Sequence, residues 1–97
     1  MRENRVERTL RLATRDRGGW AVKLLPSVSG LPDRMVLLPG GRVIFVELKS
    51  PTGRVAPHQT VVHGRLLRLG FEVIVLSSPD AVKEWAKRLD ATPSGSD

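Results

Sequence analysis

The sequence has no cysteine and no apolar stretch long enough to cross a membrane. Without cysteine, neither a disulfide nor a thiolate-ligated metal site can form among its 97 residues. A membrane-spanning helix needs about 18 or more consecutive apolar residues. The N-terminus alternates charges with single apolar residues and has no signal-peptide core. These absences predict a cytoplasmic protein with no membrane partner.

Acidic residues are the minority among the charged ones. There are 10 acidic residues against 16 basic ones, twelve of which are arginine, and the net charge is +6. Arginine is well suited to forked contacts with phosphate. A small basic domain therefore suggests a polyanionic partner, most simply nucleic acid, although excess positive charge alone can also serve solubility.

Length and composition indicate one small globular domain. The chain is 40% hydrophobic and 27% charged, as ordinary folded proteins are. We expect residues 1–90 to form the domain and the low-complexity segment 91–97 to be a solvated tail. Because a domain this short buries a limited core, its stability as a monomer should be modest, and oligomerisation would be a common remedy.

Hydrophobic spacing and turn residues predict alternating helices and strands. Helices are expected over 2–17, over 57–69 and from Pro79 onward, and strands over 20–25, 34–38, 42–49 and 71–76. The helix between the last two strands should make them parallel neighbours. The sequence therefore predicts an α/β fold with a mixed four-stranded sheet flanked by helices. Trp20 and Trp85 are expected in its core.

The third predicted strand ends in a pair of charged residues. The run Val43–Val46 is typical of a strand buried on both faces. Alternation along the strand places Glu47 and Lys49 on the same face. Charges at the end of a buried strand are costly unless they are paired or bind a metal ion.

A short turn should bring a second acid to Glu47. Three turn-forming residues, Pro39, Gly40 and Gly41, separate the second and third strands. If Leu38 pairs with Arg42, Asp33 lies opposite Glu47 on the same face, with Cβ atoms about 5 Å apart. Two carboxylates this close repel each other, and a divalent cation would relieve the repulsion.

The predicted helices carry further polar candidates. Glu7 lies between the apolar face of the first helix and a stripe of arginines, and it could reach the sheet edge. Gln59 and His63 share the face of the second helix that should contact the sheet. The residues expected to hold nucleic-acid phosphates are Arg8, Arg11, Arg15, Lys23 and Arg54.

Each candidate also has a simpler explanation. Asp33 follows Pro32, and Pro-Asp is common in turns. Glu47 and Lys49 could form a solvated pair at a frayed strand end. Glu7 could be an ordinary surface acid, Gln59 could satisfy backbone groups at a helix start, and His63 is more typical of a core or rim histidine than of a catalytic one.

The ordered set of these residues resembles a known superfamily. The segment Gly30-Leu31-Pro32-Asp33, followed by Glu47-Leu48-Lys49 and then by Gln59, resembles PD-(D/E)XK nucleases, and within them the stand-alone virus-type replication-repair nuclease (VRR-NUC) domain. The resemblance runs from about Glu7 to Leu89. It implies a restriction-endonuclease-like αβββαβ core.

The resemblance also implies roles for individual residues. Asp33, Glu47 and the Leu48 carbonyl would ligate Mg²⁺ or Mn²⁺, and Glu7 would be a further ligand with a looser correspondence to the family. Lys49 would orient or deprotonate the attacking water, and Gln59 would support the lysine or the phosphate. The stand-alone relatives suggest a homodimer acting on branched DNA or four-way junctions.

Two classes of function stay open from the sequence. One is a metal-dependent DNA endonuclease. The other is a non-catalytic basic module that binds nucleic acid, in which the acids are structural. A pure binding module has no reason to bury two acids and a lysine together, so the complete set favours the nuclease.

Overall fold

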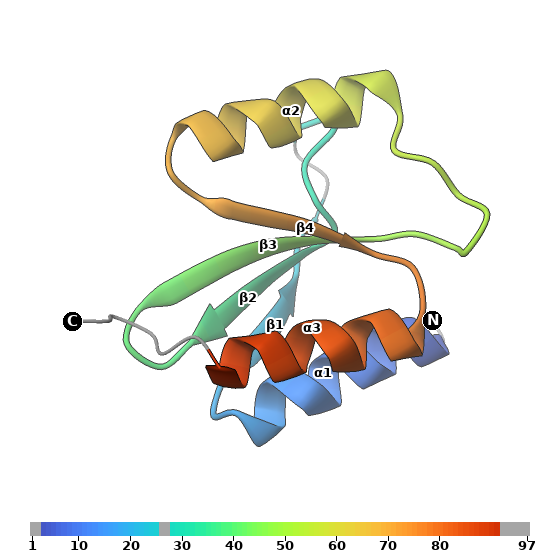
Figure 1. Cartoon of the computed structure of the whole chain (residues 1–97). Coiled ribbons are helices and arrows are strands. Elements are labelled where there is room, and N and C mark those ends of the chain that lie inside the picture. Colours follow the sequence, from blue (N-terminus) through green and yellow to red (C-terminus); the bar gives the residue numbers. More distant parts are fainter. Residues whose placement is uncertain (1–2, 26–27, 92–97) are drawn as a thin grey trace.

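The computed structural model describes residues 3–25 and 28–91. In these ranges the elements are α1 (Arg5–Asp16), β1 (Trp20–Lys23), β2 (Arg34–Leu38), β3 (Arg42–Leu48), α2 (Pro57–Arg68), β4 (Glu72–Leu76) and α3 (Pro79–Ala91), as Figure 1 shows. The predicted α/β class and the order of elements are confirmed. Helix α3 extends through Ala91, which the sequence assigned to a tail; residues 92–97 of that tail lie outside the described ranges. None of the helices described is long and apolar enough to cross a membrane.

Local signals explain where the helices begin and end. The Asn4 side chain accepts a hydrogen bond from the Glu7 amide, and the Glu7 carboxylate accepts one from the Asn4 amide, which forms a capping box at α1. Gly18, with a φ of +75°, ends the same helix in a conformation that suits glycine. At α3, the Ser78 hydroxyl accepts a hydrogen bond from the Ala81 amide and so caps the helix.

The sheet has the predicted mixed topology. Its strand order is β1-β2-β3-β4, with β2 antiparallel to both of its neighbours and β4 parallel to β3. Leu38 pairs with Arg42 and Arg34 pairs with Val46, which confirms the predicted hairpin register. Asp33 comes directly before β2 and is therefore in register with Glu47. The hairpin places the two acids at one end of the sheet.

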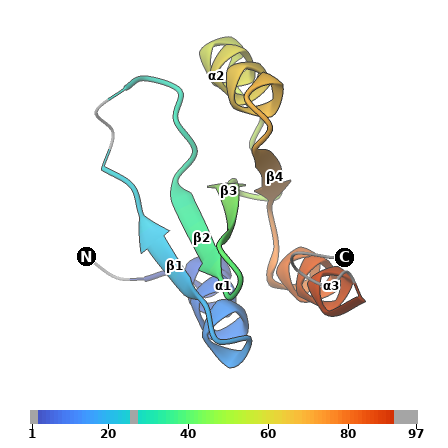
Figure 2. The same ribbon diagram turned by 90° about the vertical axis from the view of Figure 1, so that its left-hand side faces the viewer.

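One face of the sheet carries the hydrophobic core. Helices α1 and α3 pack against this face, and α2 lies on the opposite face (Figure 2). The buried hydrophobic side chains between the sheet and α1 and α3 are Leu10, Val36, Ile44, Val46, Leu76, Val82, Trp85 and Ala86.

Trp85 is in the core as predicted, whereas the prediction for Trp20 is wrong. The Trp20 residue is 67% exposed. It begins the edge strand β1 and pairs with Leu37, so it lies on the face opposite the core. In Figure 2, α2 stands on the β3 and β4 side of the sheet, away from β1, the strand that Trp20 begins.

Candidate active site

Glu47 is a buried acid on the face of β3 that α2 covers. It alternates with Val46, whose side chain belongs to the core on the other face. Glu47 is only 1% exposed. Its Oε2 atom accepts a hydrogen bond of 2.9 Å from Gln59 Nε2 and lies 3.0 Å from Lys49 Nζ. The structure thus brings together Glu47, Lys49 and Gln59, as predicted from the sequence.

The second carboxylate oxygen of Glu47 is unused. Among the described residues, no hydrogen-bond partner reaches the buried Glu47 Oε1. A buried acceptor without a partner costs about 1–3 kcal/mol, and more when it is charged. The arrangement therefore leaves a negatively charged oxygen in a position that a cation would stabilise.

Asp33 is held against the end of β3. Its Oδ2 atom accepts a hydrogen bond of 2.9 Å from the Leu48 amide. Its backbone carbonyl accepts another, also 2.9 Å long, from the Leu24 amide. Since Leu48 directly follows Glu47, these contacts fix the Asp33 carboxylate beside the segment that carries Glu47, Leu48 and Lys49.

Gln59 is fixed at both ends of its side-chain amide. Its Oε1 atom accepts a hydrogen bond of 2.9 Å from the Ala56 amide, while its Nε2 atom donates to Glu47. Ala56 is the N-cap residue of α2 and has no polar side chain of its own to cap the helix. Gln59 therefore both caps α2 and orients the buried acid.

The loop before Asp33 packs closely on α2 because Gly30 has no side chain. Gly30 has a φ of +95°, and a Cβ atom there would lie 2.7 Å from the His58 carbonyl oxygen and 2.7 Å from Val62 Cγ2. A glycine satisfies both restrictions. The close approach keeps the segment that leads to Asp33 against the helix that carries Gln59.

Glu7 belongs to the other face of the sheet. One of its oxygens accepts the Asn4 amide hydrogen at 2.8 Å, and the other pairs with the Arg34 guanidinium. The Asn4 backbone hydrogen bond and the Arg34 charge lower the pKa of the Glu7 carboxyl, although partial burial opposes them. Arg34 pairs with Val46 and therefore points toward α1 and α3. The structure does not bring Glu7 together with Asp33 and Glu47.

Side chains supply only some of the oxygen ligands that a hard divalent cation would need here. Within residues 3–25 and 28–91, no three His, Asp or Glu side chains converge as a metal-binding group. Two carboxylates, those of Asp33 and Glu47, adjoin the end of β3, where the Leu48 carbonyl is a further oxygen. Mg²⁺ commonly takes one or two carboxylates and completes its shell with waters and substrate phosphates. The unpartnered Glu47 Oε1 is consistent with such a site.

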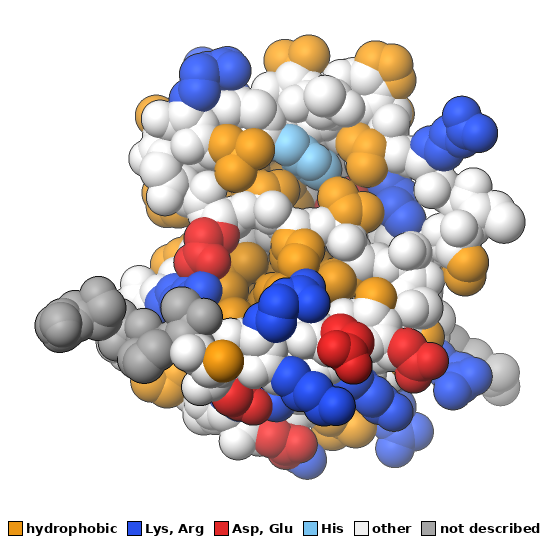
Figure 3. Space-filling model, in the orientation of Figure 1, with side chains coloured by type: hydrophobic (Ala, Val, Ile, Leu, Met, Phe, Trp, Pro, Cys, Tyr) orange, Lys and Arg blue, Asp and Glu red, His pale blue; other side chains and the backbone are white. Residues whose placement is uncertain are grey.

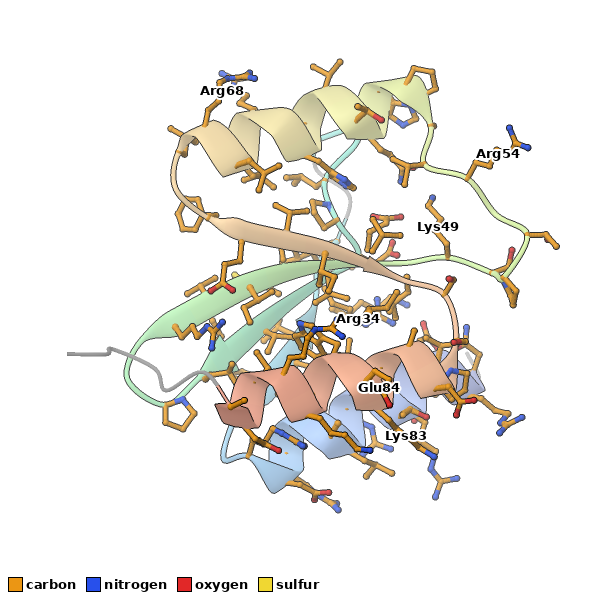
Figure 4. All side chains as sticks on the ribbon, in the orientation of Figure 1. Arg34, Lys49, Arg54, Arg68, Lys83 and Glu84 are labelled. Carbon is orange, nitrogen blue, oxygen red and sulfur yellow. The ribbon has the colours of Figure 1, made fainter. Side chains whose placement is uncertain are left out.

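The basic candidates divide between two sides of the molecule. Lys49 and Arg54 lie at the same end of the sheet in Figure 4. Lys23 is exposed at that end of β1, but it pairs with Arg34 and therefore lies on the face toward α1. In contrast, Arg8, Arg11 and Arg15 are exposed on α1, across the sheet from Glu47. Arg11 is also engaged by Glu3 in two hydrogen bonds. The structure therefore does not place the arginine stripe beside the acids.

The three helices contribute to the field at this end of the sheet. Figure 1 shows that α1, α2 and α3 all begin at the end where β3 finishes and run away from it. The N-terminus of a helix carries a partial positive charge that favours nearby anions. All three helix N-termini therefore lie at the end of the sheet that carries Asp33 and Glu47.

His63 and Arg34 are two further polar residues that are largely buried. His63 is 8% exposed, and its Nε2 atom has no hydrogen-bond partner in the described ranges; it lies in the interior, as a core histidine does. Arg34 was not among the predicted site residues, yet it contacts both Glu7 and Asp33. The signal that could have found it is its alternation with Val36, which places a charge on a buried face of β2 where it needs a partner.

Comparisons with known proteins place this geometry in context. No family model matches the chain. The chain is 46% identical over 81 residues to "Putative nuclease p44" of Acyrthosiphon pisum secondary endosymbiont phage 1, covering 82% of this chain and 87% of that protein. It is also similar to a solved structure described as a VRR_NUC domain, with 33% identity and a TM-score of 0.79 over 86% of this chain and 91% of that one.

Proposed function

This chain belongs to the VRR_NUC family of nucleases, and we propose that it hydrolyses DNA phosphodiester bonds with the help of Mg²⁺ or Mn²⁺. The metal would be held by Asp33, Glu47 and the Leu48 carbonyl. The observation that carries the proposal is the buried Glu47 carboxylate, one oxygen of which is bound by Lys49 and Gln59 while the other has no hydrogen-bond partner among the described residues.

Each side chain has a role that its contacts support. A bound divalent cation acidifies water and offsets the negative charge of the reacting phosphate. Lys49, whose side chain is 21% exposed, can contact both Glu47 and an entering water or phosphate oxygen. Gln59 keeps the Glu47 carboxylate in one orientation, and the Leu48 amide does the same for Asp33. In hydrolysis the water oxygen bonds to phosphorus and loses a proton, while one P–O ester bond breaks and the leaving sugar oxygen gains a proton.

Metal-dependent cleavage by matched variants tests the proposal. Asp33→Ala and Glu47→Gln should each lower cleavage of a DNA substrate by at least about 100-fold at saturating Mg²⁺, because electrostatic and acid–base contributions of this size are lost together. Glu72→Gln, which removes an acid at the other end of the sheet, should cleave at the wild-type rate. Near wild-type cleavage by Glu47→Gln would contradict the assignment.

The same assay separates a nuclease from a binding module. If wild-type protein binds DNA but cuts none of the substrates with Mg²⁺ or Mn²⁺, the chain is a basic nucleic-acid-binding module. DNA binding measured in EDTA provides the reference for every variant. In such a module, Asp33→Ala would change neither binding nor the metal dependence of stability.

We further propose that the active form is a homodimer that prefers branched DNA. The described residues of one chain offer one pair of acids at the end of β3, so symmetric cutting of two opposed strands needs two chains related by a two-fold axis. Exposed apolar side chains gather on α2, β4 and the turn between them: Val61, Leu67, Leu69, Phe71 and Val75. Figure 3 shows hydrophobic surface over the middle of this side, between α2 and α3. Exposed apolar patches of this kind are typical of interfaces.

Light scattering and substrate competition test the dimer. Wild-type protein at micromolar concentration should have about twice the chain mass, and Leu69→Glu should shift it toward the monomer. A four-way junction should be cut faster than a linear duplex of the same sequence. A monomeric wild type, or equal rates on both substrates, would remove this part of the proposal and leave the hydrolytic site in place.

Salt dependence tests the basic residues. If Lys23 and Arg54 contact phosphates, replacing both with glutamine should weaken DNA binding and lower the slope of log affinity against log salt by about 2. Replacing Arg8 and Arg15 should lower the slope similarly only if the DNA also reaches the α1 side. A cytoplasmic location stays a prediction from the sequence.

A further inference from the structure

Arg34 is a largely buried cation directly behind the candidate metal ligand Asp33. Its side chain is 11% exposed, on the face of the sheet opposite Glu47. One guanidinium nitrogen, Nη1, donates to the Asp33 carbonyl oxygen at 3.2 Å, and the other, Nη2, pairs with Glu7 Oε2. In Figure 4, Arg34 lies on the α3 side of the sheet and Lys49 on the α2 side. The guanidinium therefore connects α1 to the backbone of the active-site acid.

Glu7 is fixed at its own end of this connection. Its Oε1 atom accepts the Asn4 amide hydrogen at 2.8 Å, and its amide donates to Asn4 Oδ1 at 2.8 Å. The capping box holds the carboxylate over the first turn of α1, where the helix N-terminus also favours a negative charge. Glu7 thus presents Oε2 to Arg34 from a constrained position.

We propose that Glu7 is a positioning residue that acts on Asp33 through Arg34 and does not ligate the metal. This inference rests on the proposed metal-dependent nuclease function. The planar guanidinium presents its donors in a fixed fork, so holding one nitrogen on Glu7 restricts the other. Together with the Leu24 amide, Arg34 keeps the Asp33 carbonyl in place. The Asp33 carboxylate is then presented to Glu47 without having to be ordered when metal arrives.

Recruiting Glu7 as a ligand would undo these contacts. Both of its oxygens are occupied, one by the Asn4 amide and one by Arg34. Moving the carboxylate to the other face of the sheet would open the capping box. It would also leave the Arg34 guanidinium buried without its acidic partner, which is strongly destabilising. The same contacts that place Asp33 therefore oppose direct ligation by Glu7.

A double-mutant cycle with Mn²⁺ binding as the readout tests the proposal. Mn²⁺ is titrated by calorimetry, without DNA, into wild type, Glu7→Gln, Arg34→Met and the double variant. Each single change should weaken Mn²⁺ binding by about tenfold. Residues that orient metal ligands without binding the metal typically change its affinity by about 10- to 100-fold, and this is the lower end of that range. The double variant should bind as weakly as Arg34→Met and no worse, because Glu7 has no effect once Arg34 is absent.

Controls separate positioning from general loss of stability. Glu72→Gln breaks a similar acid–arginine pair, Arg42–Glu72, at the other end of β3, and should leave Mn²⁺ affinity unchanged. Arg34→Lys keeps the charge and should restore part of the affinity. If Arg34→Met does not fold, as judged by circular dichroism, Arg34→Lys, which lacks the guanidinium fork, takes its place in the cycle with Glu7→Gln.

Other outcomes identify which statement fails. Independent losses from Glu7→Gln and Arg34→Met that multiply in the double variant would indicate that Glu7 acts on the metal directly and would overturn the inference. Unchanged affinity in Glu7→Gln would also overturn it. If wild-type protein binds no Mn²⁺, or Asp33→Asn binds it as wild type does, the proposed metal site itself is wrong.

Discussion

The two faces of the sheet are packed in different ways. On the face toward α1 and α3, eight buried hydrophobic residues of the described ranges form one continuous cluster. On the face toward α2, the most deeply buried side chain of β3 is the charged Glu47, and several large apolar side chains nearby are exposed. One side of the same sheet therefore excludes water with apolar groups, while the other encloses a carboxylate.

This difference follows from the alternation of side chains along two strands. In β3, Val46 enters the core, whereas Glu47 points to α2. Beside it, Asp33 faces β3 at the site while Arg34 faces α1. Adjacent residues thus serve stability and chemistry on opposite faces. It follows that substitutions on the two faces should have separable effects on unfolding and on cleavage.

The largest effect is expected on the core face. Leu10 is fully buried in α1, and Leu10→Ala should lower the free energy of unfolding by about 3 kcal/mol through lost burial and a residual cavity. Leu67→Ala, at an exposed position of α2, should change it by less than about 0.5 kcal/mol in the monomer. Urea unfolding of both variants measures the contrast. Equal losses would mean that the two sides of the sheet are packed alike.

Lys49→Met, on the α2 face, is expected to affect cleavage and leave metal binding intact. Cleavage should fall by at least about 100-fold, because the ammonium group that orients water and offsets phosphate charge is lost. Mn²⁺ binding should persist, since Lys49 supplies no ligand and its removal takes a positive charge away from Glu47. Steady-state cleavage and Mn²⁺ titration are measured on the same preparation. Loss of Mn²⁺ binding together with activity would indicate that Lys49 organises the acids.

A loss of stability of intermediate size is expected from a substitution at Gly30, where the loop before Asp33 contacts α2. Gly30→Ala should destabilise the protein by about 1–2 kcal/mol from the positive φ alone, and more from the contact with the His58 carbonyl. Gly41→Ala has a similar φ of +81° but open space around the new Cβ, so it isolates the backbone cost. Thermal unfolding and cleavage of both variants test the difference. Gly30→Ala should lose activity, whereas Gly41→Ala should lose stability alone.

The sequence predicted the placement of the polar residues on the α2 face better than the packing around them. The three-residue turn sets the hairpin register, so the opposition of Asp33 to Glu47 could be derived from the order of residues alone. The placement of Gln59 toward the sheet followed from the spacing of polar residues on a helix that crosses between parallel strands, but the side chain it contacts is Glu47 and not Lys49. Both inferences depend on local geometry, because turn length sets the strand register and helical periodicity sets which residues share a face.

What depends on packing between distant segments could not be derived. Trp20 is exposed because α2 stands over the other half of the sheet, and no local pattern specifies that offset. Glu7 could be placed on a helix face but not on a face of the sheet. Its partner Arg34 is 27 residues away, and the link between them depends on how α1 docks.

The smallest effect is expected on thermal stability, when Mg²⁺ binds to the acids on the α2 face. Mg²⁺ that binds only the folded protein stabilises it by RT ln(1 + [Mg²⁺]/Kd), which is about 1.4 kcal/mol at ten times Kd. For a domain of this size, that corresponds to a rise of about 5–10 °C in Tm. Asp33→Asn should lose most of this rise, because it removes one of the two carboxylates, while Glu72→Gln should keep it.

Without metal, the Tm of Asp33→Asn should be equal to or slightly above that of wild type. The substitution relieves the repulsion between Asp33 and Glu47, but Lys49 Nζ, 3.0 Å from Glu47 Oε2, already offsets part of that repulsion. A metal-dependent rise of equal size in Asp33→Asn and wild type would place the bound metal elsewhere on the molecule.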